Sequence, residues 1–230
     1  MKKILTVVLL LIIILCMACV TNPGNIIPGK TFTVVCFGDS LTSGHGAVIP
    51  RVDDPDKSYP AFLKNRINAE IINAGVAGNT TAQGLSRINE DVLSKNPQLV
   101  IVKLSANDLF QGIPLQTTHD NLKEIVSLLN DGNRRIYIAK FYTEPIAREM
   151  MNMLQVTGYD AQTAVIDLYN AMFESLVVSD NIILIEDIWA GVWGIHMSDH
   201  HHPDERGYEI MADNYFNILK PYLMENNLLR

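Results

Sequence analysis

The sequence predicts an α/β fold with a five-stranded parallel sheet. Short apolar runs of the β type alternate along the chain with segments of helical period, and this alternation is typical of α/β proteins. Most of the runs are continuously apolar, as expected for parallel strands that are covered on both faces. They predict strands at residues 32–37, 70–73, 99–104, 135–141 and 181–186.

The segments between these runs predict helices. Apolar side chains with the spacing i, i+3, i+4, i+7 indicate a helix that ends before Gly132, and a similar pattern indicates an earlier helix. The positions are Leu122, Ile125, Val126 and Leu129 in the first case and Leu85, Ile88 and Val92 in the second.

The last helix is expected to begin at Pro203, because proline suits the first helical position. Asp204 and Glu205 would then lie in the first turn, where the helix dipole favours acidic side chains. One face of this helix is apolar and carries Tyr208, Met211, Ala212, Tyr215 and Leu219.

Residues 142–159 show no clear helix or strand boundary, and Pro145 interrupts them. Three methionines cluster there, Met150, Met151 and Met153. They are interpreted either as ordinary packing against the sheet or as the wall of an acyl-binding pocket, for which flexible methionine side chains are suited.

The first residues form a targeting segment, with Lys2 and Lys3 before an apolar run at 4–20. The run ends in Leu-Cys-Met-Ala-Cys, which resembles a bacterial lipobox and makes Cys19 the candidate lipidated residue. Simple secretion and an uncleaved membrane anchor are the alternatives. We expect an export signal at residues 1–19, a tether at 20–30 and one catalytic domain at 31–230, associated with the membrane through the N-terminus.

The composition excludes some functions. A net charge of -7 without clustered Lys and Arg argues against nucleic-acid binding. Outside the targeting segment only Cys36 remains, so the domain cannot form an internal disulfide, and Cys36 is expected to be a buried small apolar residue.

The first strand candidate leads into Gly38-Asp39-Ser40-Leu41, which places Ser40 at the carboxyl end of a strand, where open α/β sheets carry their sites. A serine nucleophile needs a neutral imidazole to take its proton and a carboxylate to orient that imidazole. Asp199 and His202 lie three residues apart just before the last helix and supply both groups.

Acyl transfer also needs hydrogen-bond donors for the developing oxyanion. Gly78 is a candidate through its backbone N–H, since glycine permits close approach of the main chain. Asn107 follows the third predicted strand and is a candidate through its side-chain amide.

Gly38-Asp39-Ser40-Leu41, Gly78, Asn107-Asp108 and Asp199-x-x-His202 stand in the order of the four sequence blocks of the SGNH (GDSL-type) hydrolases, which the chain resembles. The resemblance implies a flavodoxin-like three-layer sandwich, a catalytic triad of Ser40, Asp199 and His202, and an oxyanion hole of Ser40, Gly78 and Asn107. The chain looks most similar to the arylesterase, acyl-thioesterase and lysophospholipase branch. It departs at Ser105, where the family pattern has glycine, and this puts the local shape of the pocket in doubt.

Other residues near these blocks have two interpretations. Asp199-His200-His201-His202 is interpreted as part of the triad loop, with His200 and His201 exposed, rather than as a metal cluster. His45 is expected to be a solvated loop residue rather than part of the site. Trp189 and Trp193 are assigned to core packing, with an acyl-binding wall or a membrane-facing tip as alternatives, and Asp39 and Asp108 to holding turns.

The sequence therefore predicts a serine esterase for small acyl or lysophospholipid-type (thio)esters, with a small acyl ester as its partner and no metal or organic cofactor. A carbohydrate O-acetyl esterase is the alternative within the same chemistry. A lipoprotein that keeps the fold and binds a ligand without catalysis is the alternative from another class.

Overall fold

The computed structural model describes residues 31–230. The export signal, the candidate lipidation site Cys19 and the tether at 20–30 lie outside the described residues. Within residues 31–230, no helix is both long and apolar enough to cross a membrane.

Five parallel strands form the sheet, in the spatial order β2-β1-β3-β4-β5. They are β1 (Thr33–Gly38), β2 (Glu70–Gly75), β3 (Leu99–Lys103), β4 (Arg135–Ala139) and β5 (Ile182–Ile185). All five predicted strands are confirmed, with ends that differ by one or two residues. This strand order is that of the flavodoxin-like folds, so the predicted fold class is confirmed.

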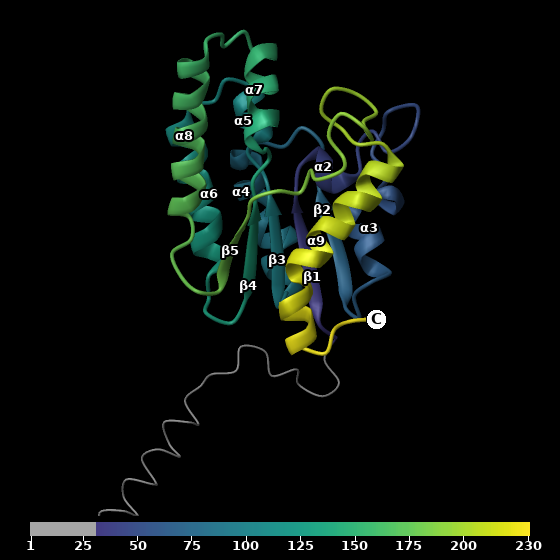
Figure 1. Ribbon diagram of the computed structural model, residues 1–230. Coiled ribbons are helices and arrows are strands. Elements are labelled where there is room, and N and C mark those ends of the chain that lie inside the picture. The colour runs from purple at the N-terminus through teal and green to yellow at the C-terminus, as the bar shows by residue number, and fades with distance from the viewer. Residues whose placement is uncertain (1–30) are drawn as a thin grey trace, which may run out of the picture.

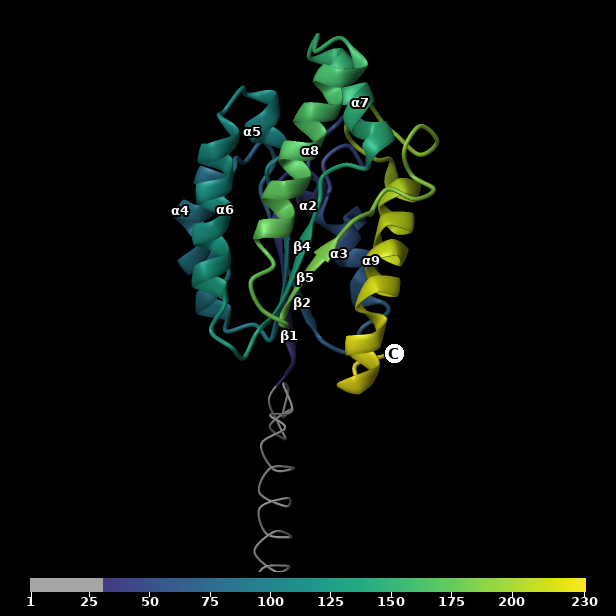
Figure 2. The ribbon, with the colours of Figure 1, turned by 60° about the vertical axis from the view of Figure 1, so that its left-hand side comes forward.

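Helices cover both faces of the sheet and make three layers (Figures 1 and 2). One face carries α3 (Tyr59–Lys64) and the last helix α9 (Glu205–Glu225), which pack against each other. The other face carries α4 (Thr81–Asp91), α6 (Leu115–Leu129) and α8 (Tyr159–Ser175). This division follows from right-handed crossovers, since the chain passes from β1 to β2 in one direction and then from β2 to β5 in the other.

The central strands lie in the apolar core. Every residue of β1 and of β3 is buried, which explains their nearly continuous apolar sequence. Between the sheet and α9, the rings of Tyr59 and Tyr215 stack with centroids 4.4 Å apart. Cys36 is buried beside them, which confirms the prediction of a buried cysteine, and this burial raises the pKa of its thiol to about 12.

Two helix starts differ from the expectation. Pro145 lies in the first turn of α7 (Glu144–Met153) and so begins this helix rather than interrupting it, because a first-turn residue needs no backbone N–H donor. The last helix begins two residues later than predicted, at Glu205, because Asp204 is its N-cap and accepts a hydrogen bond from the Gly207 N–H at 2.7 Å. Pro203 therefore precedes the cap.

Candidate active site

The candidate residues gather at the carboxyl end of the sheet, above the neighbouring strands β1 and β3. The strand order reverses at this pair, because β1 connects to β2 on one side and the later strands follow on the other side. This is the switch point at which open α/β sheets bind their ligands. Ser40 begins the short helix α2 (Ser40–Ser43) directly after β1, and Asp199 and His202 lie on the loop between β5 and α9.

The turn that carries Ser40 is tightly fixed. Asp39 caps α2, with its Oδ1 accepting a hydrogen bond from the Leu41 N–H at 3.1 Å. A Cβ on Gly38 would lie 2.1 Å from Thr42 Oγ1, so only glycine fits before the cap. Among the described residues the Ser40 N–H has no acceptor, and it is free to donate to a ligand.

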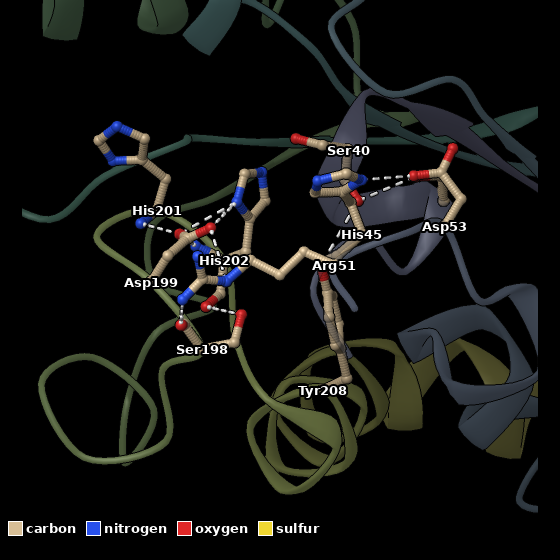
Figure 3. Close-up of polar contacts among 10 residues, drawn as sticks. Ser40, His45, Arg51, Asp53, Ser198, Asp199, His201, His202 and Tyr208 are labelled. Atoms are coloured by element: carbon tan, nitrogen blue, oxygen red, sulfur yellow. Dashed lines mark hydrogen bonds and ion pairs between the residues drawn. The ribbon is translucent and has the colours of Figure 1, made fainter. Parts of the chain in front are cut away.

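Asp199 and His202 form a hydrogen-bonded pair (Figure 3). His202 Nδ1 lies 2.9 Å from Asp199 Oδ2. Asp199 Oδ1 also accepts hydrogen bonds from the backbone N–H groups of His201 at 2.7 Å and His202 at 2.8 Å. Asp199 therefore orients the ring of His202 and the loop that carries it, and leaves Nε2 of that ring for other partners.

The charge state of this pair follows from its surroundings. Burial raises the pKa of Asp199, but the hydrogen bonds from His201 and His202 outweigh it and bring the pKa down to about 2. Burial lowers the pKa of His202 below the usual histidine value, although the bond to Asp199 acts in the opposite direction. The result is an ionised carboxylate beside a neutral imidazole at neutral pH.

Ser40 and His202 line the same cavity, which has a volume of about 60 Å³. Within residues 31–230 no hydrogen bond joins the Ser40 hydroxyl to His202. Such bonds are often long or absent without substrate and tighten in the complex. The arrangement therefore has the parts of a nucleophile, base and carboxylate set.

Asn107 also lines this cavity, and its amide Nδ2 donates to the carbonyl of Asn79 at 3.0 Å. Asn107 lies in α5 (Ala106–Phe110), directly after β3. Gly78 lies on the loop after β2 with φ +78° and is exposed at the side of the site, outside the residues that line the cavity. Its N–H has no acceptor among the described residues.

Comparison with known proteins agrees with this geometry. The model of the GDSL-like lipase/acylhydrolase family matches residues 36–210, which is most of the chain and includes the nucleophile turn and the Asp199–His202 loop. The chain belongs to this family.

This GDSL-family protein is similar to the arylesterase of Vibrio mimicus, with 28% identity over 117 residues, 49% of this chain and 56% of the relative. The chain spans about half the length of the first curated relatives it matches. Among solved structures, it resembles the SGNH-hydrolase family esterase AlinE4 (TM-score 0.57, 29% identity, covering 84% and 97% of the two chains). It shares its fold with the esterase EstA from Pseudoalteromonas sp. (TM-score 0.65, 20% identity, 84% and 98% covered).

Ser105 is the position at which this GDSL-family protein departs from the family's glycine. Its backbone has φ 109°, a conformation that favours glycine. Ser105 is fully buried, its hydroxyl has no hydrogen-bond partner, and it is not among the residues that line the cavity. The Ser105 side chain therefore lies outside the cavity wall, and what the departure adds is a non-glycine residue in a backbone conformation that favours glycine.

The rest of the cavity wall is mostly apolar. It consists of Leu41, Ala106, Phe110, Phe141, Met150, Trp189 and His201, together with the charged residues Asp39 and Lys103. Trp189 packs in the core as expected, since it is buried and donates from Nε1 to the Phe141 carbonyl at 2.9 Å, and it also lines the cavity. Of the clustered methionines, Met150 faces the cavity, Met151 is buried, and Met153 is 40% exposed.

Trp193 packs against Trp189 with ring centroids 5.2 Å apart, and its Nε1 donates to Glu149 at 2.8 Å. Asp39 holds its turn as expected. Asp108 has a structural role of another kind, because it is buried and accepts a hydrogen bond at 2.9 Å from the N–H of Thr81, which begins α4.

Two expectations about histidines are wrong. His201 is not an exposed loop residue, because its ring stacks on Phe110 with centroids 4.7 Å apart and lines the cavity. His45 is not simply solvated, because its ring meets that of His202 with centroids 4.8 Å apart. His200 is exposed as expected. Within residues 31–230, no group of three or more His, Cys, Asp or Glu side chains is arranged to hold a metal ion.

Sequence reasoning missed three residues of this site. Lys103 ends β3, lines the cavity and forms a buried ion pair with Asp39. The available signal was a lysine inside an otherwise apolar strand. Arg51 and Asp53, on the loop after α2, contact Ser198 and His45 respectively. Ser198 lies far from Arg51 in the sequence, and the spacing between His45 and Asp53 is not that of a helix or a strand pair, so no local pattern revealed these contacts.

Proposed function

We propose that this protein is a serine esterase that hydrolyses carboxylic esters of short acyl groups through an acyl-enzyme on Ser40. The observation that carries the proposal is the hydrogen bond between His202 Nδ1 and Asp199 Oδ2, 2.9 Å long, in a loop that shares one cavity with Ser40. A neutral imidazole held by a carboxylate beside a serine on a tight turn is the arrangement that acyl transfer requires.

In the first half of the reaction, Ser40 Oγ attacks the carbonyl carbon of the ester while His202 Nε2 takes the hydroxyl proton. Asp199 stabilises the imidazolium that forms. His202 then gives this proton to the leaving alcohol as the bond between the acyl carbon and the alcohol oxygen breaks. In the second half, His202 takes a proton from water, the hydroxide attacks the acyl carbon, and the carboxylic acid leaves as the proton returns to Ser40.

The oxyanion formed in each half is stabilised by N–H donors. The free Ser40 N–H and the Asn107 amide lie at the cavity and supply two of them. Gly78, with its unpaired N–H on the adjoining loop, is assigned the third. Removing one such donor typically costs about 2.7–4 kcal/mol of transition-state stabilisation.

The size of the cavity supports a short acyl group. Its volume of about 60 Å³ is far below the roughly 300–1,000 Å³ of pockets that enclose drug-sized ligands. The apolar wall of Phe110, Phe141, Met150 and Trp189 suits an aliphatic chain of a few carbons. A lysophospholipid-type acyl chain would have to extend past this wall, so small acyl esters, including O-acetyl groups, are preferred as substrates.

The test combines covalent labelling with turnover. The domain from residue 31 onward is incubated with a fluorophosphonate, the added mass is located by peptide mass spectrometry, and p-nitrophenyl esters from acetate to palmitate are assayed. Ser40→Ala is expected to lose both labelling and turnover while remaining folded. Ser86→Ala, which changes an exposed serine on α4, is the matched control and is expected to keep both.

Labelling confined to Ser40 with fastest turnover of the shortest esters supports the proposal. Folded protein that is neither labelled nor active would refute it and favour the alternative of a ligand-binding member of the fold.

We also propose that the protein is exported and held at the membrane by a lipid on Cys19. The support is the sequence of the first twenty residues, with two lysines before an apolar run that ends in a lipobox-like segment. Cys19→Ala is expected to move the full chain from the membrane fraction to the soluble fraction. An unchanged distribution, with Cys16→Ala as the control, would contradict lipidation at this residue.

A further inference from the structure

A second histidine–carboxylate pair stands beside the one already described. His45 Nδ1 lies 2.8 Å from Asp53 Oδ1. Both residues belong to the loop that leaves α2 after Gly44, and they face each other across an antiparallel bridge. The loop is closed at its base by the Asp54 N–H, which donates to the Gly44 carbonyl at 3.3 Å.

The two pairs meet through their rings. The rings of His45 and His202 lie 4.8 Å apart in an edge-to-face arrangement with an interplanar angle of 63°. Figure 3 shows the row Asp199, His202, His45, Asp53, in which the two imidazoles lie between the two carboxylates. His45 thus contacts the ring of His202 from a side that Asp199 does not occupy.

The backbone of the same loop is packed against the triad loop. A Cβ on Gly46 would lie 2.6 Å from Ser198 Oγ and 2.9 Å from His202 Cβ, so the main chain at Gly46 packs directly against side chains of the triad loop. Arg51 adds a hydrogen bond to the Ser198 carbonyl. Tyr208 on α9 donates to the His45 carbonyl at 2.7 Å and fixes the start of the loop.

We propose that His45, held by Asp53, is a positioning residue that confines the ring of His202 and sets the pH at which His202 becomes an active base. The proposal rests on the proposed function, because it assigns His45 a role in the activity of His202. In this arrangement the loop at residues 44–54 forms the side of the site that lies opposite the Asp199 carboxylate.

The electrostatic part of this role has a definite sign. When His45 carries a proton, its charge disfavours a second positive charge on His202, and the neighbouring His45 accordingly contributes to the lowered pKa of His202, after burial. The charged or titratable groups that face the two rings are Asp53, Asp199, His201, Arg51, Tyr208 and, across the cavity, Asp39 and Lys103.

The experiment reads His202 directly. The ring resonances of His202 are titrated by NMR in the wild-type domain, His45→Phe and Asp53→Asn, and kcat/KM for a short p-nitrophenyl ester is measured over the same pH range. His45→Phe keeps an aromatic ring against His202 but cannot take up a proton. We expect it to move the titration of His202 upward by about half a pH unit, the order expected for a like charge near a partly exposed group.

The acid limb of the kcat/KM profile should shift upward with the titration of His202. At acidic pH, kcat/KM is then expected to fall about threefold, while its plateau and KM change little. Asp53→Asn is expected to shift the His202 titration and the acid limb of kcat/KM in the same direction as His45→Phe, but by a smaller amount. His119→Phe, which replaces a histidine bonded to Ser175 away from the cavity, is the matched control and should shift neither.

An unchanged His202 titration in folded His45→Phe would overturn the proposal. If His45→Phe does not fold, Asp53→Asn and His45→Gln decide in its place by the same titration. The NMR result is independent of turnover, so an inactive wild-type protein would refute the proposed function and still leave the coupling between the two histidines measured.

Discussion

Lys103 Nζ lies 3.2 Å from Asp39 Oδ2, and the two side chains are 0% and 1% exposed. Asp39 caps the helix that begins with Ser40, and Lys103 ends the neighbouring strand. An unpaired carboxylate here would oppose the negative charge that develops on the oxyanion. Lys103 neutralises it, so the nucleophile turn keeps its cap without placing net negative charge at the site.

Removing Lys103 is expected to destabilise the fold strongly. Lys103→Met leaves the Asp39 carboxylate buried without its partner, and breaking a buried pair in this way costs about 3–5 kcal/mol. The double variant Asp39→Asn with Lys103→Met removes both charges and should recover part of the loss. Urea unfolding of the single and double variants measures this coupling.

Lys57→Met is the matched control, because its ion pair with Glu205 is exposed and should contribute little. A Lys103→Met variant as stable as Lys57→Met would show that the buried pair is not needed.

Ser105→Gly is expected to stabilise the protein by about 1 kcal/mol, because it relieves a side chain held at φ 109° and removes a buried hydroxyl without a partner. Ser105→Ala removes the hydroxyl but keeps the Cβ, so its gain should be smaller. Denaturant unfolding compares the three proteins. A glycine variant less stable than the alanine variant would contradict the strain.

The pH dependence of kcat/KM is expected to show an acid limb below the usual histidine range. Burial lowers the pKa of His202, and a base with a lowered pKa stays neutral and active to lower pH. Asp199, with a pKa of about 2, remains ionised throughout that range and contributes no inflection. Initial rates with a short ester from pH 4 to 9 test this, and a midpoint above about 6.5 would disagree with it.

Met150→Ala is expected to shift substrate preference toward longer acyl chains. Met150 is buried and faces the cavity, so the shorter side chain enlarges the space beside Ser40. The ratio of kcat/KM for hexanoate over acetate esters should rise by roughly tenfold, the order expected for one or two methylene groups in an apolar pocket. Met153→Ala, on the same helix but largely exposed, should leave the ratio unchanged. Equal ratios in the two variants would place the acyl group elsewhere.

Much of the fold could be predicted because it depends on local patterns. The strands near Val35, Ile101 and Ile138 are nearly continuous apolar runs, because a strand that is covered on both faces buries the side chains of both faces. The helix starts could not be predicted in this way, because Pro145 and Pro203 each suit several positions near a helix start and only the backbone conformation decides among them.

By itself the sequence determined the α/β fold and the residues for a nucleophile and its partners. Each of these follows from a local pattern: a glycine at a turn, the period of apolar residues, or the spacing Asp199-x-x-His202. Tertiary structure alone decided how these parts are adjusted. The contacts between Lys103 and Asp39 and between His45 and His202 join residues 64 and 157 positions apart, as their numbers show. Such contacts depend on how strands and loops pack in space, and burial and charge at the site follow from that packing.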